Sequence, residues 1–558
     1  MVKSMLTLQA AVVGALVLAY DASTIAQASP VDRRSEPCSS KVHRLSPPAG
    51  GAAGASIAHT SSFASFSFEP AFWVEFFGTY AAPNSLTFSL LDRIYERGGR
   101  PIIRPGGITM DSMIFDTNAT DPVRDTSPTG GVYRTTVGPE YYKSWSHFPE
   151  ELRFVSTLNF GNDSVEIARG MAEASVKYQP QRVEYLELGN EPTNYPSARW
   201  GDSTEAYVAQ WKNWTQSIDA AVNTTLSTAR VAGEVGLAGK RRWWASSATT
   251  DKSGLNVRPV DVIPAGIDAE GSVAQYSIHS YPFATCDPAR AAVATLPNLL
   301  NHTRLSAYAD DEIMPSAQAA LDSGSEWIIG EFNSVACSGQ PNVTDTFAQA
   351  LWVVDSELIY AVRNASSVHL HQGATLVFQS SQQTNSAADD GKPGFSTYDF
   401  VYPVNSTKRG EARALPSFVA QLFLAETFAE PVRAAEIPPP KGVNPDSFAA
   451  YAFYHPASGK LSKLALLNLE PMYNATAEIS LDLSGLIPRG ARPAVKRMTA
   501  PAVNEADSDK VTWAGQSYTT GQPHGHLHIE SLHSPAHFKL RNSQAALILI
   551  DPASAYSS

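Results

Sequence analysis

Short apolar runs that alternate with helix-like stretches constrain the fold of this chain more than any other feature. Eight runs have the length of buried strands, at residues 63–69, 101–106, 152–160, 183–189, 230–235, 273–279, 326–330 and 368–372. Amphipathic helical patterns lie between them, at 85–97, 164–177, 204–222, 288–321 and 346–362. Strands that alternate with helices form parallel sheets. Eight such units predict a (β/α)8 TIM barrel with insertions. A doubly wound open sheet is the alternative, but no Gly-x-Gly-x-x-Gly follows the first run.

The pattern changes near residue 431. Strand-like segments without helical periodicity follow, at 448–454, 461–469, 477–483, 495–498, 511–513, 526–529 and 545–550. We therefore predict a (β/α)8 catalytic barrel at 61–430 and an all-β sandwich domain at 431–558. The segment 29–60 is rich in Ala, Gly, Pro and Ser, and it holds one possible strand near 42–45.

The N-terminus has the features of a secretory signal peptide. Lys3 precedes an apolar run at 6–19, and Ala26 and Ala28 are small residues before a cleavage point, which gives a signal peptide at 1–28. A membrane anchor is the alternative, but the run is shorter than the roughly 20 residues that a spanning helix needs. Nine Asn-x-Ser/Thr sequons agree with a secreted, extracellular glycoprotein: Asn118, Asn162, Asn213, Asn223, Asn301, Asn342, Asn364, Asn405 and Asn474.

Three cysteines are an odd number for an oxidising compartment. Cys286 and Cys337 each follow an apolar run by a few residues, so their loops could share one rim of the barrel. We expect this pair to form a disulfide, which leaves Cys38 in a Pro/Ser/Arg-rich leader.

Charge excludes several kinds of partner. The formal net charge is −12, and no long basic cluster occurs. An acidic surface repels phosphate backbones and anionic head groups, so we predict binding neither to nucleic acid nor to membranes. We expect a monomer.

Two glutamates stand at the ends of predicted strands. Glu191 ends Glu-Leu-Gly-Asn-Glu, and Glu331 follows Trp-Ile-Ile-Gly. Side chains at the carboxyl ends of barrel strands converge on one face, and strands four and seven lie across it. A glycosidase needs one protonated carboxyl for the leaving oxygen and one ionised carboxylate for the anomeric carbon. Either glutamate alone could be an ordinary loop-edge residue; together they predict glycoside hydrolysis.

Three neighbours support this interpretation. Asn190 is placed to bind a sugar 2-hydroxyl, a contact that strengthens in the transition state. Tyr281 ends the sixth run and could hold an oxygen of Glu331, although Tyr-Pro pairs also occur for structural reasons. Arg104 ends the second run, where its charge would keep Glu331 ionised or pair with another carboxylate.

Three strings, at 104–112, 187–195 and 330–339, resemble glycoside hydrolase family 79, which contains microbial β-glucuronidases and mammalian heparanases. The resemblance covers roughly 60–555. It implies that Glu191 is the acid/base, that Glu331 is the nucleophile of a retaining enzyme, and that Glu69 and Asp111 hold sugar hydroxyls. From the sequence alone, Asp111 could also be a helix cap. The resemblance further implies that an N-terminal strand joins the β-domain.

The sequence departs from the family where the uronate carboxylate binds. The tyrosine expected shortly after the nucleophile is absent near Ala336, and no tyrosine directly follows 369–373. Backbone N–H groups of Ser338 and Gly339 could form the carboxylate site instead.

Other chemistries find little support. The pair His369/His371 and the cluster His524/His526/His528 lack Asp or Cys ligands at suitable spacing, so we predict no metal and no cofactor. No Gly-x-Ser-x-Gly elbow or phosphate loop occurs.

The sequence predicts a secreted, retaining exo-β-glucuronidase whose partner is a plant or polysaccharide glycan. Alternatives are a retaining β-glycosidase for glucosides or xylosides, a heparanase-like endo-glucuronidase, which the lack of basic clusters disfavours, and an inactive carbohydrate-binding protein.

Overall fold

The computed structural model describes residues 41–126, 134–228, 236–237, 239, 241–250, 254–374, 394–474 and 477–550. The predicted signal peptide, Cys38 and the run at 230–235 lie outside these residues. In the part of the chain that is described, no helix is long and apolar enough to cross a membrane.

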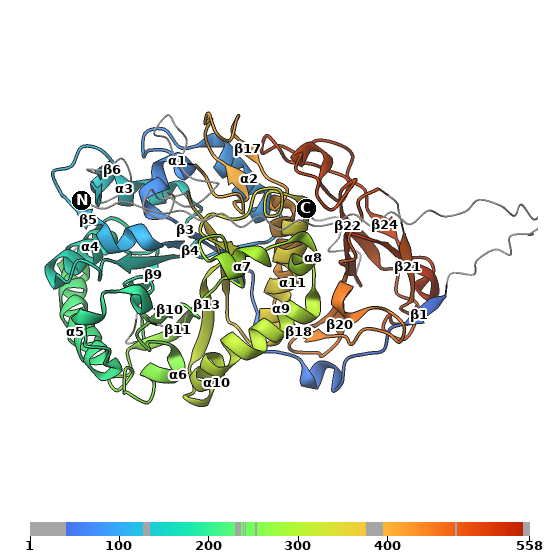
Figure 1. The fold of residues 1–558 in the computed structure, drawn as a ribbon, viewed down its shortest axis with the longest axis horizontal. Coiled ribbons are helices and arrows are strands. Elements are labelled where there is room, and N and C mark those ends of the chain that lie inside the picture. The colour runs from blue at the N-terminus through green and yellow to red at the C-terminus, as the bar shows by residue number, and fades with distance from the viewer. Residues whose placement is uncertain are drawn as a thin grey trace, which may run out of the picture. The chain divides into compact units, whose positions relative to one another are not determined.

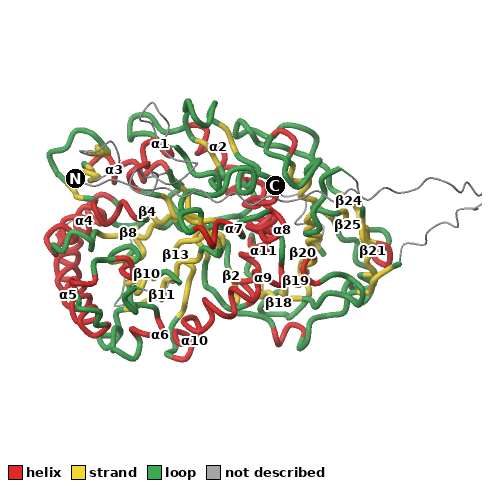
Figure 2. Tube along the Cα trace, in the orientation of Figure 1, coloured by secondary structure: helices red, strands yellow, loops and turns green. Residues whose placement is uncertain are grey.

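The predicted barrel is confirmed. Eight strands, all parallel to their neighbours, close on themselves in chain order. They are β3 (Ala64–Phe68), β4 (Ile103–Pro105), β8 (Phe154–Leu158), β9 (Val183–Leu188), β10 (Trp243–Ala248), β11 (Val273–Ser280), β13 (Glu326–Phe332) and β15 (Val368–Gln372). Figures 1 and 2 show helices such as α4, α5 and α10 around these strands.

The prediction of the fifth barrel strand at 230–235 is wrong. The strand between β9 and β11 is β10, whose sequence is Trp-Trp-Ala-Ser-Ser-Ala. Small polar residues weaken its resemblance to a buried strand, but all six of its residues are buried. Ser246 and Ser247 adopt positive φ angles of 76° and 49°, and the register shifts at this point. A strand that ends in such a bulge is hard to recognise from apolar periodicity.

Four predicted helices are present. They are α2 (Ser85–Tyr95), α4 (Val165–Tyr178), α5 (Thr204–Thr228) and α11 (Phe347–Val362). Side chains of Asn84 and Ser164 accept backbone N–H bonds at the starts of α2 and α4, which explains where those helices begin.

The predicted helix at 288–321 is instead a series of short pieces. These are α7 (Pro288–Ala292), α8 (Leu296–Leu299), α9 (His302–Tyr308), a π-helical turn (Ala309–Ile313) and α10 (Met314–Asp322). Asn301 caps α9 and Asp287 caps α7. Internal caps and prolines restart the helix instead of continuing it.

Shorter helices and strands lie outside the eight barrel strands. The helices are α1 (Trp73–Phe77), α3 (Pro139–Ser144), α6 (Pro259–Val262) and the fully buried α13 (Phe418–Phe428). The strands are β5 (Ile114–Phe115), β6 (Val123–Thr126), β7 (Arg134–Val137), β12 (Phe283–Ala284), β14 (Val335–Ala336), β16 (Val401–Tyr402) and β17 (Arg413–Ala414).

The β-domain contains two sheets. The larger runs β2-β18-β19-β20-β26-β22-β23, with β24 paired to β22, and the smaller runs β1-β21-β25. The strands are β1 (Val42–Arg44), β2 (Ala58–His59), β18 (Val432–Glu436), β19 (Phe448–Tyr454), β20 (Leu461–Asn468), β21 (Glu478–Asp482), β22 (Ala494–Thr499), β23 (Thr512–Trp513), β24 (Glu530–Ser531), β25 (Phe538–Arg541) and β26 (Gln544–Leu549). The predicted strand at 526–529 is absent, and β25 was not predicted.

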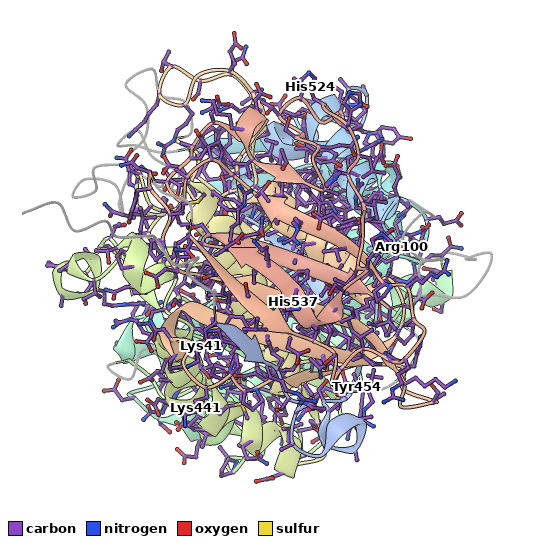
Figure 3. All side chains as sticks on the ribbon, turned by 90° about the vertical axis from the view of Figure 1, so that its right-hand side faces the viewer. Lys41, Arg100, Lys441, Tyr454, His524 and His537 are labelled. Atoms are coloured by element: carbon purple, nitrogen blue, oxygen red, sulfur yellow. A yellow bond between two sulfur atoms is a disulfide. The ribbon has the colours of Figure 1, made fainter. Side chains whose placement is uncertain are left out.

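Both faces of the larger sheet are buried. On β19, Phe448 and Ala450 belong to an apolar cluster that also contains Leu481 and Phe538 of the smaller sheet. Alternate residues such as Tyr451 and Phe453 join the barrel's own core. The β-domain therefore packs on the barrel through the sheet face opposite its own core. Figure 3 looks onto the β-domain, with His524 and Lys441 at opposite edges.

Two groups of charged side chains are buried at the contact between barrel and β-domain. His302 of α9 contacts Asp355 of α11 at 3.0 Å and Glu436 of β18 at 3.2 Å, and the hydroxyl of Tyr451 donates to Asp355 at 2.7 Å. Glu426 of α13 forms the centre of the second group. It pairs with Lys496 at 2.8 Å and accepts from the indole of Trp513 at 2.9 Å.

Candidate active site

A cavity of about 320 Å³ lies at the carboxyl ends of the barrel strands. Six of the predicted site residues line it: Glu69, Asn190, Glu191, Tyr281, Glu331 and Ser338. Arg104, Asp111 and Gly339 are not among the lining residues. The fold thus brings these six residues, from the strands β3, β9, β11 and β13 or the loops after them, to one place, as a barrel predicts.

Glu331 lies on β13, where it is 6% exposed. Its Oε1 accepts a hydrogen bond from the hydroxyl of Tyr281 at 2.8 Å, and its Oε2 accepts one from Nη1 of Arg104 at 2.9 Å. Nδ1 atoms of His279 and His371 each lie 3.9 Å from Oε2. This is the arrangement expected of a carboxylate that is held in place as a nucleophile.

The surroundings keep Glu331 ionised. Burial alone would raise its pKa, but the positive charges of His371, His279 and Arg104, together with the Tyr281 hydrogen bond, lower the pKa to about 2. The group is therefore negative at any pH at which the protein is expected to work.

Glu191 follows β9 in a left-handed backbone conformation, with φ 50° and ψ 59°. Its N–H donates to the carbonyl of Ser247 at 3.0 Å, which fixes the turn to the end of β10. Its Oε1 lies 3.0 Å from Nδ1 of His279, and its Oε2 accepts from Asn194 at 3.0 Å. Unlike Glu331, Glu191 is only half-buried.

The two carboxyl groups face each other across the cavity. One oxygen of Glu191, one of Glu331 and a ring nitrogen of His279 all lie within 4.8 Å of one another. Among the described residues this is also the only such group of three potential metal ligands, and the segment His524–His528 contributes none.

Arg104 is fully buried and connects four side chains. Its Nη1 donates to Glu331 and, at 2.9 Å, to Ser67; its Nη2 donates to Oδ1 of Asn190 at 3.0 Å; and its Nε donates to Glu187 at 2.6 Å. Burial would lower the pKa of Arg104, but Glu187 and Glu331 raise it above its ordinary value. Because Oδ1 of Asn190 accepts from Arg104, the amide nitrogen is the group of this side chain that can donate to a ligand.

Asp111 lies behind the cavity wall. Its carboxylate accepts backbone N–H bonds from Phe160, Gly161 and Asn190 at 3.3–3.4 Å. Burial raises the pKa of Asp111 to about 7. In this structure Asp111 ties the loops after β8 and β9 together through the backbone of Gly161 and Asn190. Its contact with a sugar hydroxyl stays a prediction.

Glu69 and His371 form the opposite wall. Oε1 of Glu69 accepts from both the N–H, at 2.8 Å, and the hydroxyl of Thr109. Its Oε2 lies 3.7 Å from Nε2 of His371. Burial would lower the pKa of His371, but Glu331 and Glu69 raise it above its ordinary value. His369 is deeper in the barrel, against Trp244.

The predicted disulfide between Cys286 and Cys337 is present at the cavity rim, with a Cα–Cα distance of 5.9 Å. The pairing of β12 with β14 brings the two loops together. Cys337, Ser338 and Gly339 have φ angles of 64°, 72° and 84°. Three left-handed residues in a row make a tight turn whose shape the disulfide holds.

The predicted role of Gly339 as a carboxylate donor is wrong. Its N–H donates to the carbonyl of Val335 at 3.1 Å, so the turn itself uses this group. A Cβ at this position would collide with the hydroxyls of Thr397 and Thr344, which explains the glycine. Ser338 does line the cavity.

Sequence analysis did not select several residues of the site, Asn194 among them. His279, Arg290, His371 and Tyr398 line the cavity, and Glu187 holds Arg104 from below. The tyrosine that seemed absent after the eighth strand is present as Tyr398, but it follows a segment, 375–393, that lies outside the described residues. The number of residues after β15 therefore did not reveal this tyrosine. The sequence did hold a signal for His279, because this residue lies at the end of β11, two residues before the predicted site residue Tyr281.

The asparagines of all nine sequons lie in the described part of the chain. Three asparagines are half-buried: Asn162, Asn301 and Asn364. The other six are exposed: Asn118, Asn213, Asn223, Asn342, Asn405 and Asn474. None is fully buried, so all nine positions are compatible with the predicted glycosylation.

Comparisons with known proteins find similarity to glycoside hydrolases. Residues 450–547 match the model of the glycosyl hydrolase family 79 C-terminal beta domain. A β-glucuronidase of Aspergillus niger is 30% identical over 339 residues, which cover 57% of this chain and 60% of that protein. The match thus spans less than two thirds of that relative. A β-glucuronidase of Neurospora crassa is 25% identical over 468 residues, which cover 77% of this chain and 76% of that protein.

Solved structures show the same fold. A 4-O-α-L-rhamnosyl-β-D-glucuronidase from Fusarium oxysporum has a TM-score of 0.70 at 18% identity, covering 91% of this chain and 99% of the other. An arabinofuranosidase from Xanthomonas axonopodis pv. citri has a TM-score of 0.55 at 12% identity, covering 88% and 97%. The C-terminal β-domain of this chain thus matches that of glycosyl hydrolase family 79, and the chain is similar to two β-glucuronidases.

Proposed function

We propose that this protein is a secreted β-glucuronidase that releases glucuronic acid from glycans with retention of configuration. The observation that carries the proposal is the pair of carboxyl groups: oxygens of Glu191 and Glu331 lie within 4.8 Å of each other in one cavity. Retaining glycosidases place their carboxyl groups about 5–5.5 Å apart, whereas inverting enzymes need about 6.5–9.5 Å to admit a water.

In the first step Glu331 attacks the anomeric carbon. A bond forms between a carboxylate oxygen and that carbon while the bond to the leaving oxygen breaks, and Glu191 gives its proton to the leaving oxygen. Tyr281 and Arg104 hold the two oxygens of Glu331 in place for this attack. Asn190 supports the sugar through its free amide.

In the second step water replaces Glu331. Glu191 is now ionised and takes a proton from the water. The water oxygen bonds to the anomeric carbon, and Glu331 leaves as a carboxylate. Two displacements on opposite faces restore the original configuration. Asn194 and His279 keep Glu191 oriented in both steps.

Cationic and hydroxyl groups on the cavity wall support an acidic sugar. Arg290, His371 and Tyr398 line the cavity together with Ser338. The raised pKa of His371 favours its charged form. A uronate carboxylate is attracted by such charges, and a charge-assisted hydrogen bond contributes roughly 1.5–3 kcal/mol. The similarity to two β-glucuronidases supports the same substrate class.

The apolar run at 6–19 and nine sequons that are exposed or half-buried support secretion. The net charge of −12 favours a neutral or weakly charged glycan over a highly sulfated one.

Matched aryl β-glycosides test the proposal. We expect the glucuronide to have the highest kcat/KM among glucuronide, glucoside, xyloside and galactoside, and NMR to show the β-anomer as the first product. The Glu331→Gln protein, prepared in parallel, controls for contaminating activity. An α-anomer would overturn the retaining mechanism. Faster hydrolysis of a neutral sugar would overturn the uronate specificity and leave the retaining mechanism standing.

A further inference from the structure

Glu187 is a buried carboxylate that no step of the proposed mechanism uses. It lies on β9, four residues before Glu191, with no exposed surface. Its Oε2 accepts from Nε of Arg104 at 2.6 Å and from the hydroxyl of Thr157 at 2.8 Å, and its Oε1 accepts from the hydroxyl of Ser247 at 2.5 Å. Three donors from three strands therefore fix it below the cavity.

We propose that Glu187 is a positioning residue that acts on Glu331 through Arg104. It holds the guanidinium by Nε, so that Nη1 reaches Glu331 and Nη2 reaches Asn190. It also offsets part of the positive charge that Arg104 directs at Glu331. This inference rests on the proposed function, in which Glu331 is the nucleophile.

The geometry of the guanidinium supports the claim that Glu187 positions Arg104. Arginine is planar and presents its donors in a fixed fork. With Nε fixed to Glu187, the directions of the two remaining nitrogens are set, and they meet Glu331 at 2.9 Å and Asn190 at 3.0 Å. Ser247 strengthens the link, because its hydroxyl donates to Glu187 while its carbonyl accepts from the N–H of Glu191.

The charges around Glu331 support the claim that Glu187 offsets part of the positive charge of Arg104. Glu331 faces Arg104, His279 and His371 within 3.9 Å. A carboxylate that is surrounded only by positive charge is a weak nucleophile and a good leaving group. A negative charge at Glu187, buried at 2.6 Å from the same guanidinium, moderates this effect.

The two chemical steps respond to this charge in opposite directions. In forming the glycosyl-enzyme, Glu331 donates an electron pair to the anomeric carbon, so a less basic carboxylate reacts more slowly. In breakdown of the same ester, Glu331 departs with that pair, so a less basic carboxylate leaves faster. A side chain that merely supports the fold would slow both steps.

Glu187→Gln tests the charge at nearly constant shape. We expect kcat/KM for an aryl glucuronide to fall about ten-fold. We expect the intermediate trapped with 2-deoxy-2-fluoro-β-glucuronyl fluoride to hydrolyse several-fold faster than in the unchanged protein. Glu184→Gln is the matched control: it lies on the same strand but lines a separate cavity with Gln275 and Glu326. It should leave both rates unchanged.

Slowing of both steps, or of neither, in a folded Glu187→Gln protein would overturn the inference. If that variant does not fold, Glu187→Asp carries the test. It keeps the charge but draws back from Nε by one methylene, so kcat/KM should fall about ten-fold without faster breakdown of the trapped ester. Unchanged rates in Glu187→Asp would also overturn the inference. If the fluorinated sugar fails to label Glu331 in the unchanged protein, the proposed function fails instead.

Discussion

The cavity at the barrel mouth and the contact between barrel and β-domain both bury clusters of charged side chains, but only one of them faces open space. At the mouth, Glu331 and Glu191 line a cavity of about 320 Å³. At the contact, His302 fits between Asp355 and Glu436, so its charge meets protein on both sides.

The two clusters differ in whether their charged groups can react with a bound molecule. Glu426 at the contact is paired with Lys496 and with the indole of Trp513 on β23. Arg97 also lies 3.3 Å from Glu426. Removing the Glu426 carboxylate would leave buried positive charge without this compensation and would cost about 3–5 kcal/mol. At the mouth, in contrast, Glu191 is half-buried and can exchange a proton with a bound substrate. Substitutions at the mouth should therefore change activity, and substitutions at the contact should change stability.

Glu331→Gln tests this contrast with the largest expected effect. Because an amide cannot form the glycosyl ester, kcat/KM should fall by at least about 10³-fold for every leaving group. The glutamine oxygen can still accept from Tyr281 and Arg104, so the protein should fold. Activity with aryl glucuronides and a thermal melt measure the two properties. Loss of less than ten-fold in activity would remove Glu331 from the role of nucleophile.

Glu191→Gln should have a smaller and more selective effect. The variant cannot protonate the leaving oxygen, a contribution of about 10²–10⁴-fold for poor leaving groups. Activated phenols need little protonation, so dinitrophenyl glucuronide should be affected least. A series of aryl glucuronides of rising phenol pKa measures this. Equal losses across the series would assign Glu191 another role.

The sequence predicted that Glu191 and Glu331 lie in one site because each follows an apolar run directly. The position of a residue at a strand end is a local property, and barrel topology converts it into proximity. The same argument could not find Glu187, although it stands in the string that contains Glu191. Its importance depends on Arg104, which comes from another strand, and the sequence does not show which inward-facing residues meet.

Local patterns failed where the backbone is irregular. The strand β10 ends in two left-handed serines, and its sequence lacks the β-branched residues that indicate a strand. The turn at Cys337–Gly339 uses the N–H that the sequence suggested was available to a substrate. Tyr398 lines the cavity although it lies 26 residues after the end of β15, so spacing from that strand was misleading.

The pH dependence of stability should report on the contact. Burial would lower the pKa of His302, but Asp355 and Glu436 raise it to about 10. A folded-state pKa above the unfolded value near 6.5 means that the stabilisation is complete below pH 6.5 and is lost as the pH rises towards 10. The loss should be on the order of 3–5 kcal/mol.

His302→Gln isolates that contribution. The difference in unfolding free energy between the unchanged and variant proteins, measured by denaturant titration from pH 6 to 10, should shrink as the pH rises. The difference cancels other groups that titrate in this range, such as Lys463, whose pKa burial lowers to about 8. A constant difference would mean that His302 is neutral at the contact. The kcat/KM of the folded variant should not change at pH 6.

Two buried tyrosines test, with the smallest expected effects, whether the mouth determines activity and the contact determines stability. Tyr398 lines the cavity, whereas the hydroxyl of Tyr451 donates to Asp355 at 2.7 Å at the contact. Tyr451→Phe should lower the unfolding free energy by about 1.5–3 kcal/mol, because a hydrogen bond to a charged group is lost. Its preference for glucuronide over glucoside should stay the same. Tyr398→Phe should reduce that preference by about ten-fold and leave the melting temperature almost unchanged, because Tyr398 lines the proposed substrate cavity. If Tyr398→Phe instead destabilised the protein with its preference intact, the hydroxyl at the mouth would serve the fold, and recognition of the uronate would fall to Arg290 and His371.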